Sequence, residues 1–239
     1  MISAPSRLYL LQLGTAQIPL PNGTLDMVLG CYLVQTDDGQ NILIDSGLPA
    51  DHADQPGTTG ETNVIDQLQQ LGLSPADIDI VICTHLDIDH IGHHAAFAHT
   101  ELIVQREEYE AAFSGHSRFA ATRAVWDHPA LHYRLVDGDT ELLPGLTLIK
   151  TSGHTPGHQS ILVRLPHTGS VLLASDAVMF QRLFTPDAPA WPMHDNAEQT
   201  RASTHKLLAL VEREHIALAI FSHDGQQWQT LKKAPAYYD

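Results

Sequence analysis

Four apolar segments of this sequence each end directly before a histidine or an aspartate, and this repetition restricts the possible folds more than any other feature. IDIVICT precedes His85, LTLIKTSG precedes His154, SVLLAS precedes Asp176 and IALAIFS precedes His223. Their length and their β-branched residues predict buried strands. Because sites are commonly built on loops that follow rigid strands, we predict that folding brings these four residues together.

The first of these segments leads into the densest group of titratable residues, THLDIDH, which holds His85, Asp87, Asp89 and His90. A single histidine such as His154 can close a turn, and a single aspartate at a strand end commonly caps a helix. Four such groups buried together without a cation would cost far more. The set as a whole therefore predicts a metal site.

The order of the remaining elements predicts the layers of the fold. Helices are expected over 61–72, over 106–113 and from the capping residue Asn196 to about Glu214. Between them we expect short strands over 7–13, 27–35, 41–45, 78–84, 101–105, 131–136, 146–151, 160–165, 170–175 and 216–221. Less regular segments are a loop over 46–60, an irregular or helical insertion over 114–129 and an aromatic loop over 180–196. Similar element orders in the two halves predict one domain, residues 1–239, of two layers packed sheet to sheet with helices outside.

The charge of the chain argues against nucleic acid and membranes as partners. Lys and Arg total 13 against 28 Asp and Glu, a formal net charge of −15, so the basic surface that binds polyanions is missing. No apolar run approaches the roughly 18 residues of a membrane span, and residues 1–11 lack the pattern of a signal peptide, so a cytoplasmic protein is expected. Cys31 and Cys83 lie in apolar runs, which predicts two buried free thiols.

A known family shares these motifs. THLDIDH resembles the HxHxDH motif of the metallo-β-lactamase superfamily, and GHTPGH, SDA and SHD match its later ligand positions in order. IVQREEYEAA, GHTPGHQS and GSVLL are similar to the N-acyl-homoserine lactonase branch. The resemblance implies an α/β fold, an αββα sandwich of two mixed sheets with helices outside, and two divalent metal ions at one edge of the sandwich. Relatives of this kind are often dimers, which implies a homodimer.

The resemblance also assigns roles to single residues. It implies that one metal ion is held by His85, Asp87 and His154, that the other is held by Asp89, His90 and His223, and that Asp176 bridges the two. A hydroxide shared by the ions would be the nucleophile. Asp89 would pass a proton to the departing alkoxide. Asp45 would orient a ligand histidine, and His158 would support the site by hydrogen bonding.

Asp87 departs from the family motif, where the second ligand is histidine. A carboxylate adds negative charge and a hard oxygen donor, so zinc stays the first expectation while iron, manganese or cobalt become compatible with the site. Flavodiiron proteins, a related group, also carry a carboxylate here. The alternative is that Asp87 has lost the ligand role and that the first metal ion binds weakly or not at all.

A second departure concerns the substrate. The lactonases carry a tyrosine three residues after the bridging aspartate, and this chain has Met179 there, which cannot donate a hydrogen bond as a phenol does. Met179, Phe180, Phe184 and Trp191 form an apolar group near Asp176. They either line a substrate pocket suited to an acyl chain or an aryl group, or pack a loop onto the sheet.

Three classes of function compete. The leading hypothesis is a metal-dependent hydrolase that opens lactone rings of small molecules, N-acyl-homoserine lactones above all. The same site could instead act on phosphotriesters, aryl esters or thioesters. An oxygen- or NO-reducing di-iron protein would need a flavin domain for which the chain has no room, and a non-catalytic binding module would not need the complete ligand set.

Overall fold

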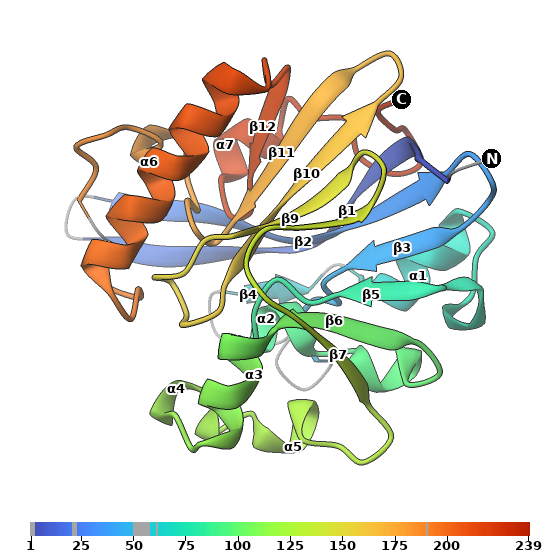
Figure 1. Ribbon diagram of the computed structural model, residues 1–239, viewed down its shortest axis with the longest axis horizontal. Coiled ribbons are helices and arrows are strands. Elements are labelled where there is room, and N and C mark those ends of the chain that lie inside the picture. Colours follow the sequence, from blue (N-terminus) through green and yellow to red (C-terminus); the bar gives the residue numbers. More distant parts are fainter. Residues whose placement is uncertain (1–2, 21–22, 50–57, 61, 190) are drawn as a thin grey trace.

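The structure, a computed structural model, describes residues 3–20, 23–49, 58–60, 62–189 and 191–239. Its strands form two sheets (Figure 1). The strands of the seven-stranded sheet are, in spatial order, β4 (Thr58–Gly60), β1 (Pro5–Leu20), β2 (Gly23–Thr36), β3 (Asn41–Ile44), β5 (Ile80–Ile82), β6 (Glu101–Gln105) and β7 (His132–Val136). Those of the five-stranded sheet are β12 (Leu218–Phe221), β11 (Gly169–Ser175), β10 (Gln159–Leu165), β9 (Leu146–Lys150) and β8 (Thr140–Leu143).

The α-helices of the described residues follow the strands. They are α1 (Val64–Gln70), α2 (Ile88–Ile91), α3 (Arg106–Phe113), α4 (Ser117–Ala120), α5 (Arg123–Trp126), α6 (Ala197–Arg213) and α7 (Gly225–Trp228). The predicted bounds of α3 agree with the structure, and α6 begins after Asn196, whose side chain accepts hydrogen bonds from the backbone N–H groups of Glu198 and Gln199. Gly72 follows α1 with a φ of +76°, a conformation that favours glycine.

Along a strand, alternate side chains lie on opposite faces of the sheet. In β1, Leu8 and Leu10 lie in the cluster between the two sheets, while Tyr9 and Leu11 lie in the cluster on the outer face. The inner cluster also contains residues of the five-stranded sheet, such as Ile161. The two sheets are therefore held face to face by one continuous apolar core.

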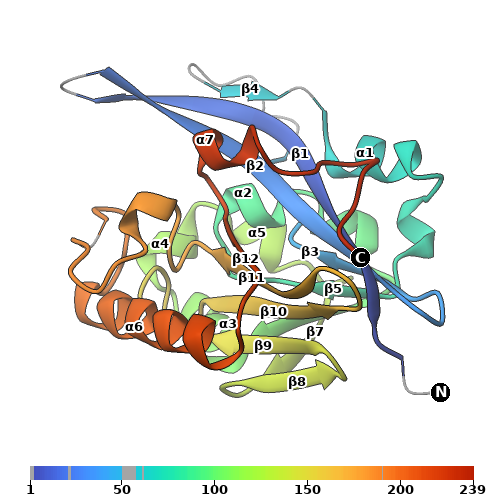
Figure 2. The same ribbon diagram turned by 90° about the horizontal axis from the view of Figure 1, so that it is seen from above.

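Helices cover the outer faces of both sheets. Leu207 and Leu210 of α6 pack against the five-stranded sheet, and Val64 and Leu68 of α1 pack against the seven-stranded sheet. Figure 2 shows the two sheets between these helices, with α6 on one side and α1 on the other. The predicted αββα sandwich of two mixed sheets is confirmed.

Several elements differ from the sequence-based expectation. β8 was not predicted, because TELL is a short edge strand with two polar residues among four. β1 and β2 are longer than expected, since they form one long hairpin along most of their length. Of the loop predicted over 46–60, residues 50–57 lie outside the described part of the chain, and residues 58–60 form β4.

Two further expectations can be compared with the structure. Cys31 and Cys83 are free and buried, as predicted. Among the described residues, the structure contains no helix that is both long enough and apolar enough to cross a membrane.

Parallel pairing decides where the functional loops lie. β3, β5, β6 and β7 run parallel to one another, and β11 runs parallel to β12 in the other sheet. The carboxyl ends of parallel strands meet at one edge of a sheet, where binding sites of α/β proteins are usually found. The residues that follow β5, β11 and β12 therefore reach a common edge of the sandwich.

Candidate functional site

The side chains predicted as metal ligands lie together at this edge. His85 follows β5, Asp87 is the N-terminal cap residue of α2, and Asp89 and His90 lie on α2 itself. The five-stranded sheet contributes the remaining three, His154 from the loop between β9 and β10, Asp176 after β11 and His223 after β12.

His85, Asp87 and His154, here called the first subsite, form one group of donors. His154 Nε2 lies 3.0 Å from Asp87 Oδ2, and His85 Nε2 lies 3.5 Å from the same oxygen. The three donor atoms lie within 4.8 Å of one another, as metal ligands around one ion do.

Asp89, His90 and His223, here called the second subsite, form another group. Asp89 Oδ2 lies 3.7 Å from His90 Nε2 and 3.6 Å from His223 Nε2. Asp176 stands between the subsites: its Oδ2 lies 3.4 Å from His154 Nε2 and 3.1 Å from His223 Nε2. One carboxylate thus reaches both groups.

The chemistry of this donor set fits divalent cations. His85 and His90 are buried, and within the described part of the chain the Nε2 atom of each has no hydrogen-bond partner, which is costly unless another group uses its lone pair. Burial lowers the pKa of His90, but Asp89, Asp176 and Asp45 raise it well above its usual value. In the same way Asp176 outweighs burial and raises the pKa of His223 to about 9. Carboxylates in excess at a buried site create a demand for positive charge that metal ions would meet.

Asp45 holds the second subsite from behind. Its Oδ2 lies 2.8 Å from Nδ1 of His90 and accepts a hydrogen bond of 2.7 Å from the Thr84 hydroxyl, while its Oδ1 accepts one of 2.8 Å from Thr84 N–H. A carboxylate at Nδ1 favours the tautomer whose Nε2 is free to bind a metal ion. Asp45 adopts a φ of +62°, which a short polar residue tolerates better than most.

His158 contacts the backbone of the bridging residue. Its Nε2 accepts a hydrogen bond of 3.0 Å from the N–H of Asp176, and its Nδ1 lies 2.8 Å from the hydroxyl of Thr151. Burial lowers the pKa of His158 well below its usual value, so the ring stays neutral and can accept this bond. The side chain supports the site rather than supplying a donor to it.

Sequence reasoning missed Arg118, a residue of α4. Its Nε donates a hydrogen bond of 2.6 Å to Asp87 Oδ1, and its Nη2 donates one of 2.5 Å to Asp87 Oδ2. Nη2 also lies 3.0 Å from Nε2 of His154. Nη1 donates to the Met193 carbonyl and to Asp195. The insertion over 114–129, whose pattern is irregular, thus places a cation against the first subsite.

Glu108 of α3 is a second residue that sequence reasoning missed. It is fully buried, and its two oxygens accept hydrogen bonds from the N–H groups of Leu86 (2.9 Å) and Gly157 (2.8 Å). Burial raises its pKa to about 7. A Cβ on Gly157 would lie 2.2 Å from the backbone nitrogen of Glu108, so only glycine permits this approach. Glu108 joins the loop of His85 to the loop of His154.

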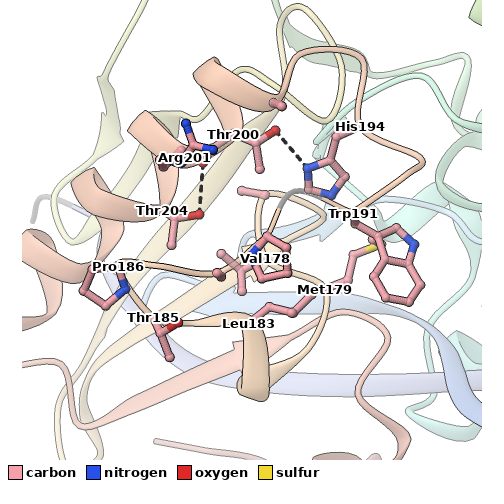
Figure 3. A pocket seen from close by; sticks show the side chains of 14 residues that line it. Val178, Met179, Leu183, Thr185, Pro186, Trp191, His194, Thr200, Arg201 and Thr204 are labelled. Carbon is pink, nitrogen blue, oxygen red and sulfur yellow. Dashed lines mark hydrogen bonds between the residues drawn. The ribbon is translucent and has the colours of Figure 1, made fainter.

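The apolar residues predicted to contact substrate occupy two environments. Met179 and Trp191 line a small pocket together with Leu183 and His194 (Figure 3). Phe180 packs with Met27 and Met179, and the Phe184 ring lies 5.3 Å from that of Phe221. The space inside the cavity is only about 20 Å³, which holds a single water molecule.

A larger opening lies directly beside the ligands. It has a volume of about 370 Å³, and Met193 at its rim is 52% exposed. The residues that line it are Asp87, Ile88, Asp89, Arg118, Thr122 and Met193. A small molecule can therefore reach both subsites from this side.

Comparison with known sequences agrees with this geometry. The profile of the Metallo-beta-lactamase superfamily matches residues 31–223, which include all seven donors. The chain belongs to the metallo-β-lactamase superfamily. With this family membership and its grouped donor residues, it is a metal-dependent hydrolase.

Relatives narrow the branch of the superfamily. An N-acyl homoserine lactonase from Bacillus sp is 34% identical over 231 residues, covering 91% of this chain and 89% of the relative. The N-acyl homoserine lactonase AttM of Rhizobium radiobacter is 33% identical, covering 97% of this chain and 98% of the relative. At these identities the chain belongs to the lactonase branch within the superfamily.

Solved structures of that branch superpose on the whole chain. The crystal structure of a quorum-quenching N-acyl homoserine lactone lactonase covers 100% of both chains with a TM-score of 0.88 and 31% identity. A structure of a Bacillus thuringiensis AiiA variant, with N-decanoyl-L-homoserine bound at its active site, has a TM-score of 0.86 and 30% identity and covers 98% of this chain and 100% of that one. This metallo-β-lactamase fold is therefore shared along its full length.

Proposed function

We propose that this protein hydrolyses the lactone ring of small molecules, most specifically N-acyl-homoserine lactones. One observation carries the proposal: two groups of donors, joined by Asp176, lie at an opening large enough for a small substrate. Two relatives that match over 89% and 98% of their own length are N-acyl homoserine lactonases, and N-decanoyl-L-homoserine is bound at the active site of a structurally similar AiiA variant.

The proposed ligand set follows the two subsites. His85, Asp87 and His154 would hold one divalent ion, Asp89, His90 and His223 would hold the other, and Asp176 would contact both. Bound ions of this kind supply an activated water near neutral pH and a Lewis acid for the carbonyl and the departing oxygen. Zinc fits a site with four histidines, and Asp87 keeps iron, manganese and cobalt compatible with it.

Asp89 is the proposed catalytic acid. Its side chain is 25% exposed, more than any other carboxylate of the donor set, and it lines the opening. Opening a lactone ring releases an alkoxide, which leaves only if a proton reaches its oxygen. Asp89 can deliver that proton from its free oxygen because it is both at the metal edge and open to solvent. Asp45 and His158 would position the donors during this step without touching the substrate.

The substrate would approach through the opening beside Asp87 and Asp89. Its acyl chain would extend toward the aromatic loop, where Met179 and Trp191 present apolar surface. Phe180 packs against Met179 and Phe184 packs against the five-stranded sheet, so both would support this apolar surface without contacting the acyl chain. Because the space at Met179 is only about 20 Å³, an acyl chain can occupy it only if side chains that line it move.

One observation favours a second candidate on the same site. Met179 occupies the position expected to contact the substrate carbonyl and is 2% exposed, so no phenol is available there as a donor. Substrates polarised mainly by metal ions, such as aryl esters, thioesters or phosphotriesters, depend less on such a donor. Hydrolysis of these substrates is the alternative.

The decisive experiment pairs elemental analysis with turnover on one preparation. Metal-replete protein should open an N-acyl-homoserine lactone faster than a simple γ-lactone, an aryl ester or paraoxon, and chelation should abolish turnover. The Asp89→Asn variant should lower kcat by about 10²–10⁴, the usual contribution of a general acid. Absence of lactone turnover in metal-replete protein would refute the proposal, and preferred turnover of paraoxon or the aryl ester would establish the alternative.

Other expectations from the sequence are part of the same proposal. We propose that residues 1–239 act as one domain, since the inner apolar cluster draws on both sheets. A homodimer and a cytoplasmic location stay predictions, as does the absence of nucleic-acid and membrane partners, for which the net charge of −15 is the support. Size-exclusion chromatography with light scattering would measure the oligomeric state.

A further inference from the structure

The two subsites differ in how their histidines are held. In the second subsite, His90 Nδ1 lies 2.8 Å from Asp45 and His223 Nδ1 lies 2.8 Å from the carbonyl of Val28. In the first subsite, Nδ1 of His85 lies 3.0 Å from the hydroxyl of Thr84, but Nδ1 of His154 is buried and has no partner among the residues that the structure describes. A metal-binding histidine usually donates its other ring N–H to a fixed acceptor, which orients the ring and strengthens the ligand. His154 lacks this support.

The first subsite also contains a competing cation. Nη2 of Arg118 lies 2.5 Å from Asp87 Oδ2 and 3.0 Å from His154 Nε2, and these are two of the three donor atoms that an ion would need. In the described ranges of the chain, no arginine or lysine nitrogen lies within salt-bridge distance of Asp89 or Asp176. The guanidinium is fixed in place because Nη1 is bound to Asp195 and to the carbonyl of Met193.

Charge explains why this arginine accompanies Asp87. A neutral imidazole at position 87 would leave the seven donor residues with the negative charges of Asp89 and Asp176 alone. Asp87 adds one negative charge, and Arg118, bound to it through both carboxylate oxygens, removes that charge. The pair is therefore neutral, as imidazole is, but its oxygens are already engaged by strong hydrogen bonds that an incoming ion must weaken.

We propose that the two subsites bind metal with unequal affinity, and that Arg118 sets the difference by competing with the ion for Asp87 and His154. The second subsite fills first and retains its ion. The first subsite fills only at higher free metal concentration, so Arg118 makes the second ion of the pair exchangeable. This inference rests on the metal site of the proposed function and does not depend on which substrate is hydrolysed.

Metal titration of chelator-stripped protein tests this without any substrate. Cobalt absorbance and elemental analysis at buffered free metal should show one ion per chain at low concentration and a second at a concentration at least tenfold higher. The Arg118→Gln variant should tighten the weaker ion at least tenfold, or about 1.4 kcal/mol, and leave the tighter one unchanged. The Asp87→His variant, which removes the anchor of Arg118 and supplies a neutral ligand, should give two tight ions.

Arg123→Gln is the matched control. Arg123 lies on the next helix and pairs with Asp127 at the surface, so its loss should change neither affinity. Circular dichroism would check that the variants fold. If Arg118→Gln does not fold, Asp87→His still tests the proposal. Equal metal affinities of the two subsites in the wild type would overturn the proposal. So would a first subsite that binds its ion no more tightly in Arg118→Gln than in the wild type. A protein that shows the predicted titration but no lactone turnover would refute only the proposed function.

Discussion

Replacing Asp45 by asparagine changes one atom behind the second subsite and tests how that subsite is built. The substituted asparagine keeps the shape of the side chain and tolerates the φ of +62° found at this position, so the backbone has no reason to move. Its carbonyl can still accept from the N–H of Thr84. Its NH₂ group, however, would face His90 Nδ1 where a carboxylate oxygen now lies at 2.8 Å.

An NH₂ donor at this position reverses the tautomer of His90. Nδ1 must then accept, the ring proton moves to Nε2, and Nε2 can no longer bind an ion. Partners of this kind typically contribute 10–100-fold to metal affinity, or about 1.4–2.7 kcal/mol. We expect Asp45→Asn to weaken the ion of the second subsite by that factor and to leave the first subsite nearly unchanged.

Competition with a chelator of known affinity measures this effect, and thermal unfolding of the metal-free protein separates it from loss of folding. Asp79→Asn is the matched control, because Asp79 Oδ2 accepts a hydrogen bond of 2.8 Å from the N–H of Asn41 at the opposite end of the same two strands. If Asp45→Asn binds both ions as tightly as the wild type, the tautomer argument is wrong.

Three further predictions follow from the described contacts. Glu108→Gln should cost about 1–3 kcal/mol in urea unfolding at pH 5, since one of the two N–H groups loses its acceptor. The free energy of unfolding of the wild type should fall by up to about 3 kcal/mol as the pH rises from 4.5 through 7, because burial raises the pKa of Glu108 to about 7 and ionisation of this side chain disfavours the folded state. This loss of stability should be missing in the variant. Trp191→Ala should change KM about tenfold for substrates with long acyl chains and little for those with short ones, and equal effects on KM for both chain lengths would exclude Trp191 as a contact. Phe184→Ala should lower the free energy of unfolding by about 2 kcal/mol and leave KM unchanged. Chelation should remove the stabilisation that each bound ion gives, about 2.7 kcal/mol for an ion at a hundredfold excess over its Kd, and the melting temperature should fall as a result. An unchanged melting temperature in metal-free protein would contradict the placement of the donors.

The sequence predicts the layers and the donors because both depend on local patterns. Apolar runs followed by His85, His154, Asp176 and His223 mark the strands and their common edge, and alternation along β1 assigns Leu8 and Tyr9 to opposite faces. The capping residue Asn196 similarly fixes the start of α6. These features are encoded within a few neighbouring residues.

Arg118 and Glu108 could not be found in this way. Arg118 is 31 residues from Asp87 in a segment without clear periodicity, and only folding shows that the two meet. Glu108 sits beside Glu107 in REEYEAAF, and nothing in that spacing reveals that one carboxylate is buried while the other is exposed. Position 87 carried the one available signal: an aspartate in place of a histidine calls for a compensating positive charge nearby.

Each subsite draws two donors from the seven-stranded side of the molecule and one from the five-stranded side. A bound ion is therefore a cross-link between the halves of the sandwich, closing a loop of about 70 residues between His85 and His154 and a longer one between His90 and His223. Binding of the weaker ion would hold together the donor loops of the two sheets at this edge of the sandwich, here called the rim. Its release would let the two sheets separate first at the rim. Amide hydrogen exchange at the rim would then report the metal supply directly, before any change in the apolar layer beneath.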